Sequence, residues 1–160
     1  MGAMKTERDE FVSFSWGLAL AYPLIVVWGI DFIVSAALRR DMALASEWLP
    51  KLFQSAIAAL PFVALAICGM ALLGNRRGNH HIEGSGDRRV LSGLRFASAT
   101  VTAASIVLWI AYYWDSIAAY NERTLGGASI GLGLLILFSP LLLSLLIPLA
   151  YLIGVKLSKY

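Results

Sequence analysis

The sequence predicts an all-α, polytopic membrane protein with four transmembrane helices. Of its 160 residues, 59% are hydrophobic and 14% are charged, and the mean hydropathy is +0.73. A soluble domain usually has about 25% charged and about 45–50% apolar residues. This much apolar surface cannot be buried inside a soluble chain of this length. We therefore expect one membrane domain that covers residues 1–160.

Four apolar stretches exceed the roughly 20 helical residues that cross about 30 Å of hydrocarbon. They cover residues 11–38, 52–74, 94–120 and 125–155. Helices are expected because an isolated strand leaves its backbone polar groups unsatisfied in lipid. The first stretch is longer than the roughly 7–15 apolar residues of a signal peptide, so it is expected to be a span. The last is long, and tilting or kinking at Pro140 and Pro148 is expected to absorb the excess.

The distribution of Lys and Arg predicts that both termini are cytoplasmic, because cytoplasmic loops carry an excess of these residues. One side of the membrane would hold Lys5, Arg8, Arg76, Arg77, Arg88, Arg89, Arg95, Lys156 and Lys159. The other side would hold Arg39, Arg40, Lys51 and Arg123. The Arg39-Arg40 pair argues weakly for the opposite orientation, although acidic residues lie beside it.

A glycine- and arginine-rich loop over residues 75–92 would then be cytoplasmic. It lacks apolar periodicity, so we expect it to be mobile. Its four arginines are expected to attract anionic lipid headgroups, at about 1 kcal/mol for each residue close to the surface. These arginines are Arg76, Arg77, Arg88 and Arg89.

The spans resemble one another in pairs, which suggests two helical hairpins related by a weak tandem repeat. The second span contains LPFVALAICGMALLGNR and the fourth contains SPLLLSLLIPLAYLIGVK, each with an early proline, a late glycine and then a basic residue. The first and third each place a Trp and an Asp near their outer ends, in WGIDFIVSAAL and WDSIAAY. A true repeat would have its symmetry axis along the membrane normal. The alternative is chance similarity between apolar helices.

Two aspartates at the outer edge form the candidate binding site. Asp31 follows about twenty apolar residues, and an ionisable group at such depth is a functional candidate. Asp115 ends the third span, and aromatic side chains that attract cations accompany both carboxylates. The candidate site for a cation or amphiphile is Asp31, Asp115, Trp28, Trp114 and Tyr112. The simpler interpretation, which we favour, is an interfacial carboxylate within an aromatic belt.

Small residues in the third and fourth spans predict close helix contacts. Gly127 and Gly131 have the small-xxx-small spacing that lets helix backbones touch. Such contacts serve either packing within the chain or association with another copy or another membrane protein.

No pattern points to catalysis or to a cofactor. The sequence has no Ser-His-Asp set, CxxC, Walker loop or dinucleotide fingerprint. The spans contain no histidine for haem, and His80-His81 lacks the accompanying ligands of a metal site. The basic residues flank apolar segments, so nucleic-acid binding is not expected. We expect neither metal nor cofactor.

Two hypotheses of function remain open. The first is a non-enzymatic membrane protein that acts through its helix surfaces, as a homo-oligomer or as an accessory subunit. The second is a small oligomeric transporter or channel that uses the two aspartates and the outer aromatics. A membrane enzyme acting on lipid lacks the clusters that such chemistry needs. On composition alone, we expect the inner membrane of a bacterium.

Overall fold

The computed structural model describes residues 2–37, 48–74, 85–121 and 130–158. Over these residues every regular element is a helix, as the apolar runs predict. The elements are α1 (Gly2–Pro23), the π-helix η1 (Leu24–Gly29), α2 (Ile30–Ala37), α3 (Trp48–Gly74), α4 (Ser85–Asn121) and α5 (Ile130–Leu157).

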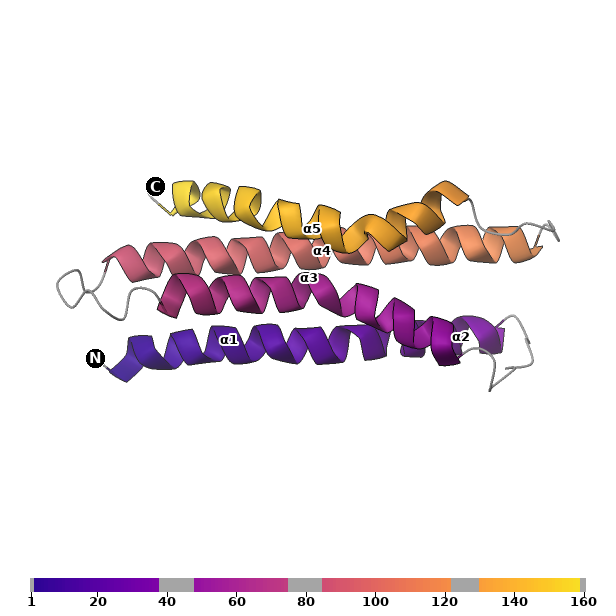
Figure 1. Cartoon of the computed structure of the whole chain (residues 1–160), viewed down its shortest axis with the longest axis horizontal. Coiled ribbons are helices and arrows are strands. Elements are labelled where there is room, and N and C mark those ends of the chain that lie inside the picture. Colours follow the sequence, from indigo (N-terminus) through magenta and orange to yellow (C-terminus); the bar gives the residue numbers. More distant parts are fainter. Residues whose placement is uncertain (1, 38–47, 75–84, 122–129, 159–160) are drawn as a thin grey trace.

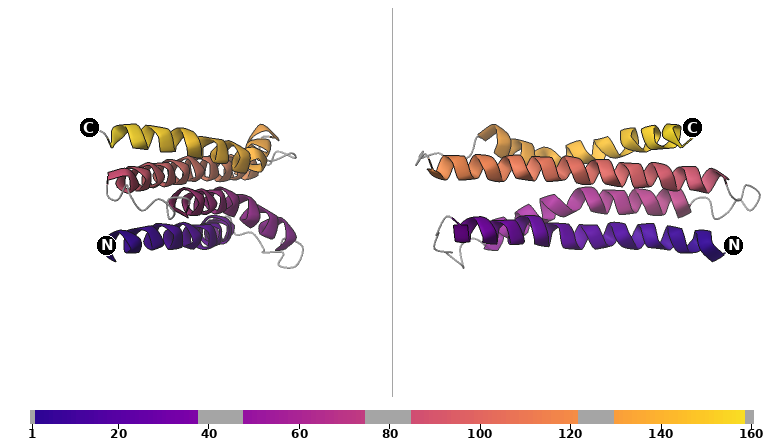
Figure 2. Two further views of the ribbon diagram at one scale, coloured as in Figure 1. Left: turned by 60° about the vertical axis from the view of Figure 1, so that its left-hand side comes forward. Right: turned by 180° about the vertical axis from the view of Figure 1, so that it is seen from behind.

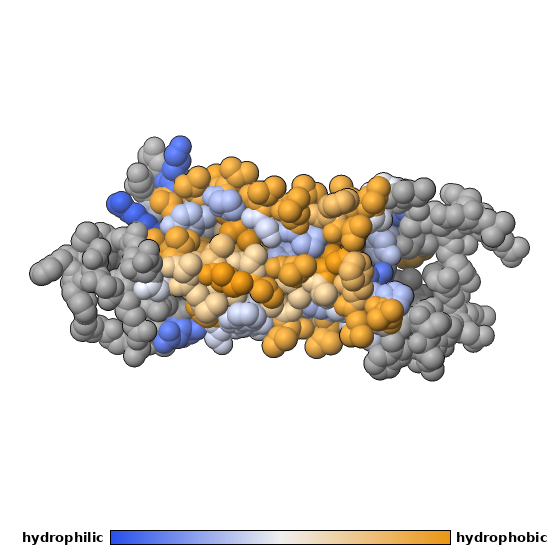
Figure 3. All heavy atoms as spheres, in the orientation of Figure 1, coloured by the Kyte–Doolittle hydropathy of each residue, from blue (hydrophilic) through white to orange (hydrophobic). Residues whose placement is uncertain are grey.

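Four helical segments in the described part are long and apolar enough to cross a membrane. They are Asp9–Gly29, Leu49–Gly74, Arg88–Asp115 and Gly131–Leu157, and less than half of each is buried inside the bundle. Figure 3 shows a broad hydrophobic band across the middle of the visible face, with hydrophilic residues toward its two ends. An apolar surface of this extent is consistent with a membrane protein, because lipid can cover it. The orientation of the termini stays a prediction.

The helices lie along one axis, and both chain termini are at the same end (Figure 1). The most extensive packing joins α4 to α5 and α1 to α3, and α3 also packs on α5 and on α4. The views of Figure 2 agree that α1 lies beside α3 and that α5 lies beside α4. In contrast, α1 and α4 hardly touch. The bundle is therefore open between these two helices.

Several helix boundaries differ from those of the predicted spans, since α1 already begins at Gly2 and α3 at Trp48. The loop predicted over residues 75–92 is shorter, because α4 already begins at Ser85. Val90 and Leu91 are buried in the core and hold these first turns of α4 against the bundle. Arg88 and Arg89 are consequently exposed on a helix. The first predicted span is also interrupted, since η1 separates α1 from α2.

The π-helix follows Pro23, the last residue of α1. Proline has no backbone N–H to donate to the preceding turn, and the chain continues with the wider π turn, in which the Ile30 N–H bonds to the Ile25 carbonyl. The Tyr113 hydroxyl of α4 donates to the Val26 carbonyl at 3.0 Å and lies 3.4 Å from that of Val27. A side chain distant in sequence therefore satisfies the carbonyls of this wide turn.

We expect Tyr113→Phe to lower the free energy of unfolding by about 1 kcal/mol, because a buried hydrogen bond is lost and its carbonyl acceptors remain. Tyr22→Phe is the matched control, since no hydrogen bond of standard geometry reaches the buried Tyr22 hydroxyl in the described part of the chain. Its removal is expected to cost nothing. Reversible unfolding in mixed micelles measures the free energy of unfolding of both variants. An equal decrease in the two variants would contradict this role of Tyr113.

A close approach between helices joins Gly93 of α4 to Gly154 of α5. A Cβ added at Gly154 would lie 2.7 Å from the Phe96 Cβ and 2.9 Å from the Gly93 Cα. Glycine permits this backbone contact because it has no side chain. Of the glycines predicted for packing, Gly127 lies outside the described residues and Gly131 is exposed.

Candidate functional site

The structure places Trp28 and Tyr112, two residues of the predicted outer site, against the same helix. The Trp28 Nε1 donates to the Ser55 Oγ at 3.0 Å. The Gln54 Nε2 donates to the Tyr112 Oη at 3.4 Å. Ser55 and Gln54 belong to the first turns of α3, so this helix links η1 to α4 through polar side chains.

A cation of the chain itself lies against Trp28. The Lys51 Nζ is 5.6 Å from the centre of the Trp28 ring, within the range of a cation–π interaction. The sequence-based hypothesis reserves the aromatic residues for an external cation. Lys51 therefore contacts the ring of Trp28, and the binding of an external cation at this ring stays a prediction.

Two of the remaining residues of the predicted outer site, Trp114 and Asp115, lie next to each other on α4. Trp114 is 76% exposed on α4, and Asp115 is half-buried at the next position. The side chain of Asp31 in α2 lies outside the described residues, as do Arg76, Arg77, His80 and His81. The pairing of the two aspartates stays a prediction.

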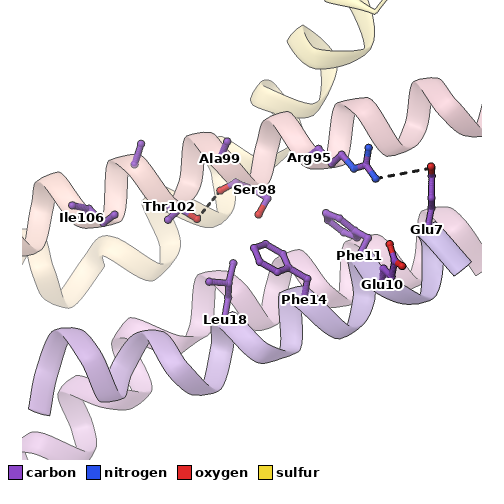
Figure 4. A pocket seen from close by; sticks show the side chains of 11 residues that line it. Glu7, Glu10, Phe11, Phe14, Leu18, Arg95, Ser98, Ala99, Thr102 and Ile106 are labelled. Carbon is purple, nitrogen blue, oxygen red and sulfur yellow. Dashed lines mark hydrogen bonds and ion pairs between the residues drawn. The ribbon is translucent and has the colours of Figure 1, made fainter. Parts of the chain in front are cut away.

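A second candidate site, which the sequence did not indicate, is a groove between α1 and α4 (Figure 4). It encloses about 630 Å³. We call it the α1–α4 groove, and it is lined by Glu7, Glu10, Phe11, Phe14, Leu18, Arg95, Ser98, Ala99, Thr102, Ala103 and Ile106.

The walls of the α1–α4 groove follow from helical spacing. On α1, Phe11, Phe14 and Leu18 recur every three or four residues and therefore share one face. On α4, the facing positions are mostly small, such as Ala99 and Ala103, so that space remains between the two helices. In Figure 4 the aromatic side chains of α1 point toward this wall of α4.

The depth of the groove is apolar although serine and threonine line it. The Thr102 hydroxyl donates to the Ser98 carbonyl of its own helix at 2.8 Å, a bond that satisfies the hydroxyl without a ligand. Phe11 is buried, and its ring rests on α3, where a Cβ at Gly69 would lie only 2.9 Å from it. The close packing of the Phe11 ring on Gly69 holds one wall of the groove in place.

Charge is confined to one end of the groove. The Arg95 Nη2 lies 3.9 Å from the Glu7 Oε2, and both side chains are about half exposed (60% and 48%). Exposed pairs of this kind contribute only about 0–1 kcal/mol. Glu10 makes no ion pair with another described residue. Two carboxylates and one guanidinium thus line this mouth.

The length of the groove matches one half of a bilayer. The wall on α1 runs from Glu7 to Leu18, and the wall on α4 runs from Arg95 to Ile106. The two walls contain the same number of residues. At 1.5 Å per residue, each wall is about 16 Å long. The hydrocarbon core of a bilayer is about 30 Å thick, so the groove has the length of one leaflet.

No known protein family, curated protein or solved structure matches this chain. The functional conclusions therefore follow from the geometry of the helices and the chemistry of the side chains that line the groove.

Proposed function

We propose that this chain is a non-enzymatic integral membrane protein that acts through its helix surfaces, by holding the acyl chain of a membrane lipid in the α1–α4 groove. The observation that carries the proposal is the order of polarity along the groove. Its depth is apolar, and its charged residues, Glu7, Glu10 and Arg95, lie together at one end. A lipid has the same order, with an apolar chain joined to a polar headgroup.

The groove is accessible from the surface of the bundle. Phe14 is 59% exposed and Ile106 is 42% exposed, and Ala99 and Ala103 are also exposed. A chain could therefore enter sideways from the leaflet. Small side chains on α4 allow close contact with it, and such dispersion contacts are the main gain when an apolar group leaves lipid for protein.

The residues that line the groove favour binding over catalysis. They include no histidine or cysteine that could act as a nucleophile or base beside an acyl carbonyl. The hydroxyl of Thr102 is bonded to its own helix. The carboxylates lie at the exposed end, beside Arg95.

We expect Ala103→Trp to abolish retention of the tightly bound lipid, because the indole fills the space between the helices. Ile110→Trp is the matched control, since Ile110 is 58% exposed on the same helix and does not line the groove. The measurement is the amount of phospholipid that the purified protein keeps, by native mass spectrometry. Unchanged retention in Ala103→Trp would refute the proposal.

A second candidate function is association of α4 with another membrane helix. A shallow hollow on α4 is formed by small and apolar residues, among them Ala99, Ala103 and Ala104. Small residues of this kind allow helices to approach closely. Ala103 borders both hollows, so lipid retention and oligomeric state must both be measured in Ala103→Trp to separate the two functions. Loss of an oligomer with lipid retention unchanged would favour the second.

The transporter hypothesis depends on Asp31 and Asp115, and it stays a prediction from the sequence. Under the lipid-binding proposal, the neutral Asp31→Asn variant retains its lipid.

A further inference from the structure

The charged residues at the mouth of the α1–α4 groove indicate which lipid headgroup the groove would bind. Arg95 presents its guanidinium at this end, and it is 60% exposed. A guanidinium has five N–H donors in a planar fork, which suits the oxygens of a phosphate. The distance of 3.9 Å to Glu7 is too long for a hydrogen bond. Donors of Arg95 are therefore available to a phosphate at the mouth.

Glu10 adds a second carboxylate one helical turn from Glu7. Like charges three residues apart on a helix repel each other. Among the described residues, the ion pair of Arg95 is with Glu7 and not with Glu10. Glu10 is exposed and lines the groove beside Phe11. Figure 4 shows its carboxylate at the open end of the groove, near Glu7. A cationic group placed there would relieve the repulsion.

We propose that the groove selects a phospholipid whose headgroup carries a primary ammonium, with its phosphate on Arg95 and its ammonium on Glu10. This inference rests on the proposed function, because the acyl chain must lie in the groove for the headgroup to reach the mouth. Phosphatidylethanolamine has this chemistry. In the predicted orientation it would come from the cytoplasmic leaflet.

The charges at the mouth disfavour the other common headgroups. The charges that line the groove, two carboxylates and one guanidinium, sum to one net negative charge. They disfavour an anionic headgroup such as phosphatidylglycerol at the mouth itself, whereas Arg88 and Arg89 attract anionic lipid to the surrounding surface. The quaternary ammonium of phosphatidylcholine has no N–H and cannot donate a hydrogen bond to Glu10. The aromatic residues that line the groove are Phe11 and Phe14, both of α1, and rings on one helix do not surround a choline as an aromatic cage does.

The test is a titration of the purified full-length chain with three lipids that have identical acyl chains: phosphatidylethanolamine, phosphatidylglycerol and phosphatidylcholine. Native mass spectrometry measures the bound fraction of each. We expect phosphatidylethanolamine to bind about tenfold more tightly, the size of one charge-assisted hydrogen bond. Glu10→Gln should remove this preference, and Arg95→Gln should weaken the binding of all three lipids.

Two variants serve as matched controls, because they remove a neighbouring charge that does not line the groove. They are Asp9→Asn on α1 and Arg88→Gln on α4, both at exposed positions. Neither is expected to change the order of the lipids. Glu10→Lys places a cation at the mouth and should shift the preference to phosphatidylglycerol.

The outcomes separate the two proposals. Equal binding of the three lipids, with no effect of Glu10→Gln or Glu10→Lys, would overturn the headgroup inference and leave the groove intact as an acyl-chain site. Lipid binding that is insensitive to Ala103→Trp would overturn the proposed function itself.

Discussion

Replacement of Gly154 by leucine is expected to lower the free energy of unfolding by about 3 kcal/mol or more. The first atom of any side chain at this position would lie 2.9 Å from the Gly93 Cα and 2.7 Å from the Phe96 Cβ. These atoms cannot rotate away, so α4 and α5 must separate. Their contact is the most extensive in the bundle. Overpacking costs about 1–3 kcal/mol where neighbouring side chains can adjust, and here they cannot.

Gly133→Leu is the matched control for this prediction. Gly133 also lies in α5, but a Cβ at this position would meet nothing within 4 Å. Both substitutions replace glycine, which has a low helix propensity, by leucine, so this contribution to stability is the same in both. Any difference between their free energies of unfolding is therefore due to the contact with α4. Unfolding in mixed micelles gives the two free energies, and similar values would contradict the packing described between α4 and α5.

Trp109→Ala is expected to lower the free energy of unfolding by about 3 kcal/mol. The Trp109 side chain is 2% exposed, and its ring centre lies 5.8 Å from that of Tyr112 and 6.0 Å from that of Tyr113. Its removal leaves a cavity, which costs about 3–5 kcal/mol for a buried aromatic in water-soluble proteins. The lower end applies because lipid replaces water as the surrounding medium and reduces the transfer contribution.

Trp114→Ala provides the comparison on the same helix. Trp114 is 76% exposed, so its removal leaves no cavity. We expect a change below about 0.5 kcal/mol, as for surface substitutions in general. The same unfolding assay applies. A loss at Trp114 as large as that at Trp109 would show that this face of α4 is buried by another molecule.

The helices could be predicted from the sequence because their signal is local. A long and mostly apolar run such as 131–155 is enough to indicate a helix that could span a membrane. The π-helix η1 could not be predicted in this way. It depends on Pro23 and on Tyr113, whose hydroxyl bonds to a carbonyl 87 residues away in the chain. The start of α4 was missed for a related reason, since Val90 and Leu91 follow a polar stretch and are held only by packing.

The candidate site depended still more on tertiary structure. Trp109 and Trp114 belong to one aromatic segment, and only the packing of α4 shows that the first is buried and the second exposed. In the sequence, Arg95 is one of several arginines that indicate the cytoplasmic side. Its place opposite Glu7 results from the separation of α1 and α4, which no local pattern encodes. Ala99 and Ala103 are small residues four positions apart, a pattern that is visible in the sequence but indicates only helix packing in general.

Photo-crosslinking can show whether a lipid acyl chain lies in the α1–α4 groove. The protein is reconstituted in vesicles of a phospholipid that carries a diazirine on its acyl chain. We expect label to concentrate on the groove residues, such as Phe14 and Leu18 of α1 and Ile106 of α4. Label spread evenly over the lipid-exposed leucines, including Leu141 and Leu145 of α5, would contradict it.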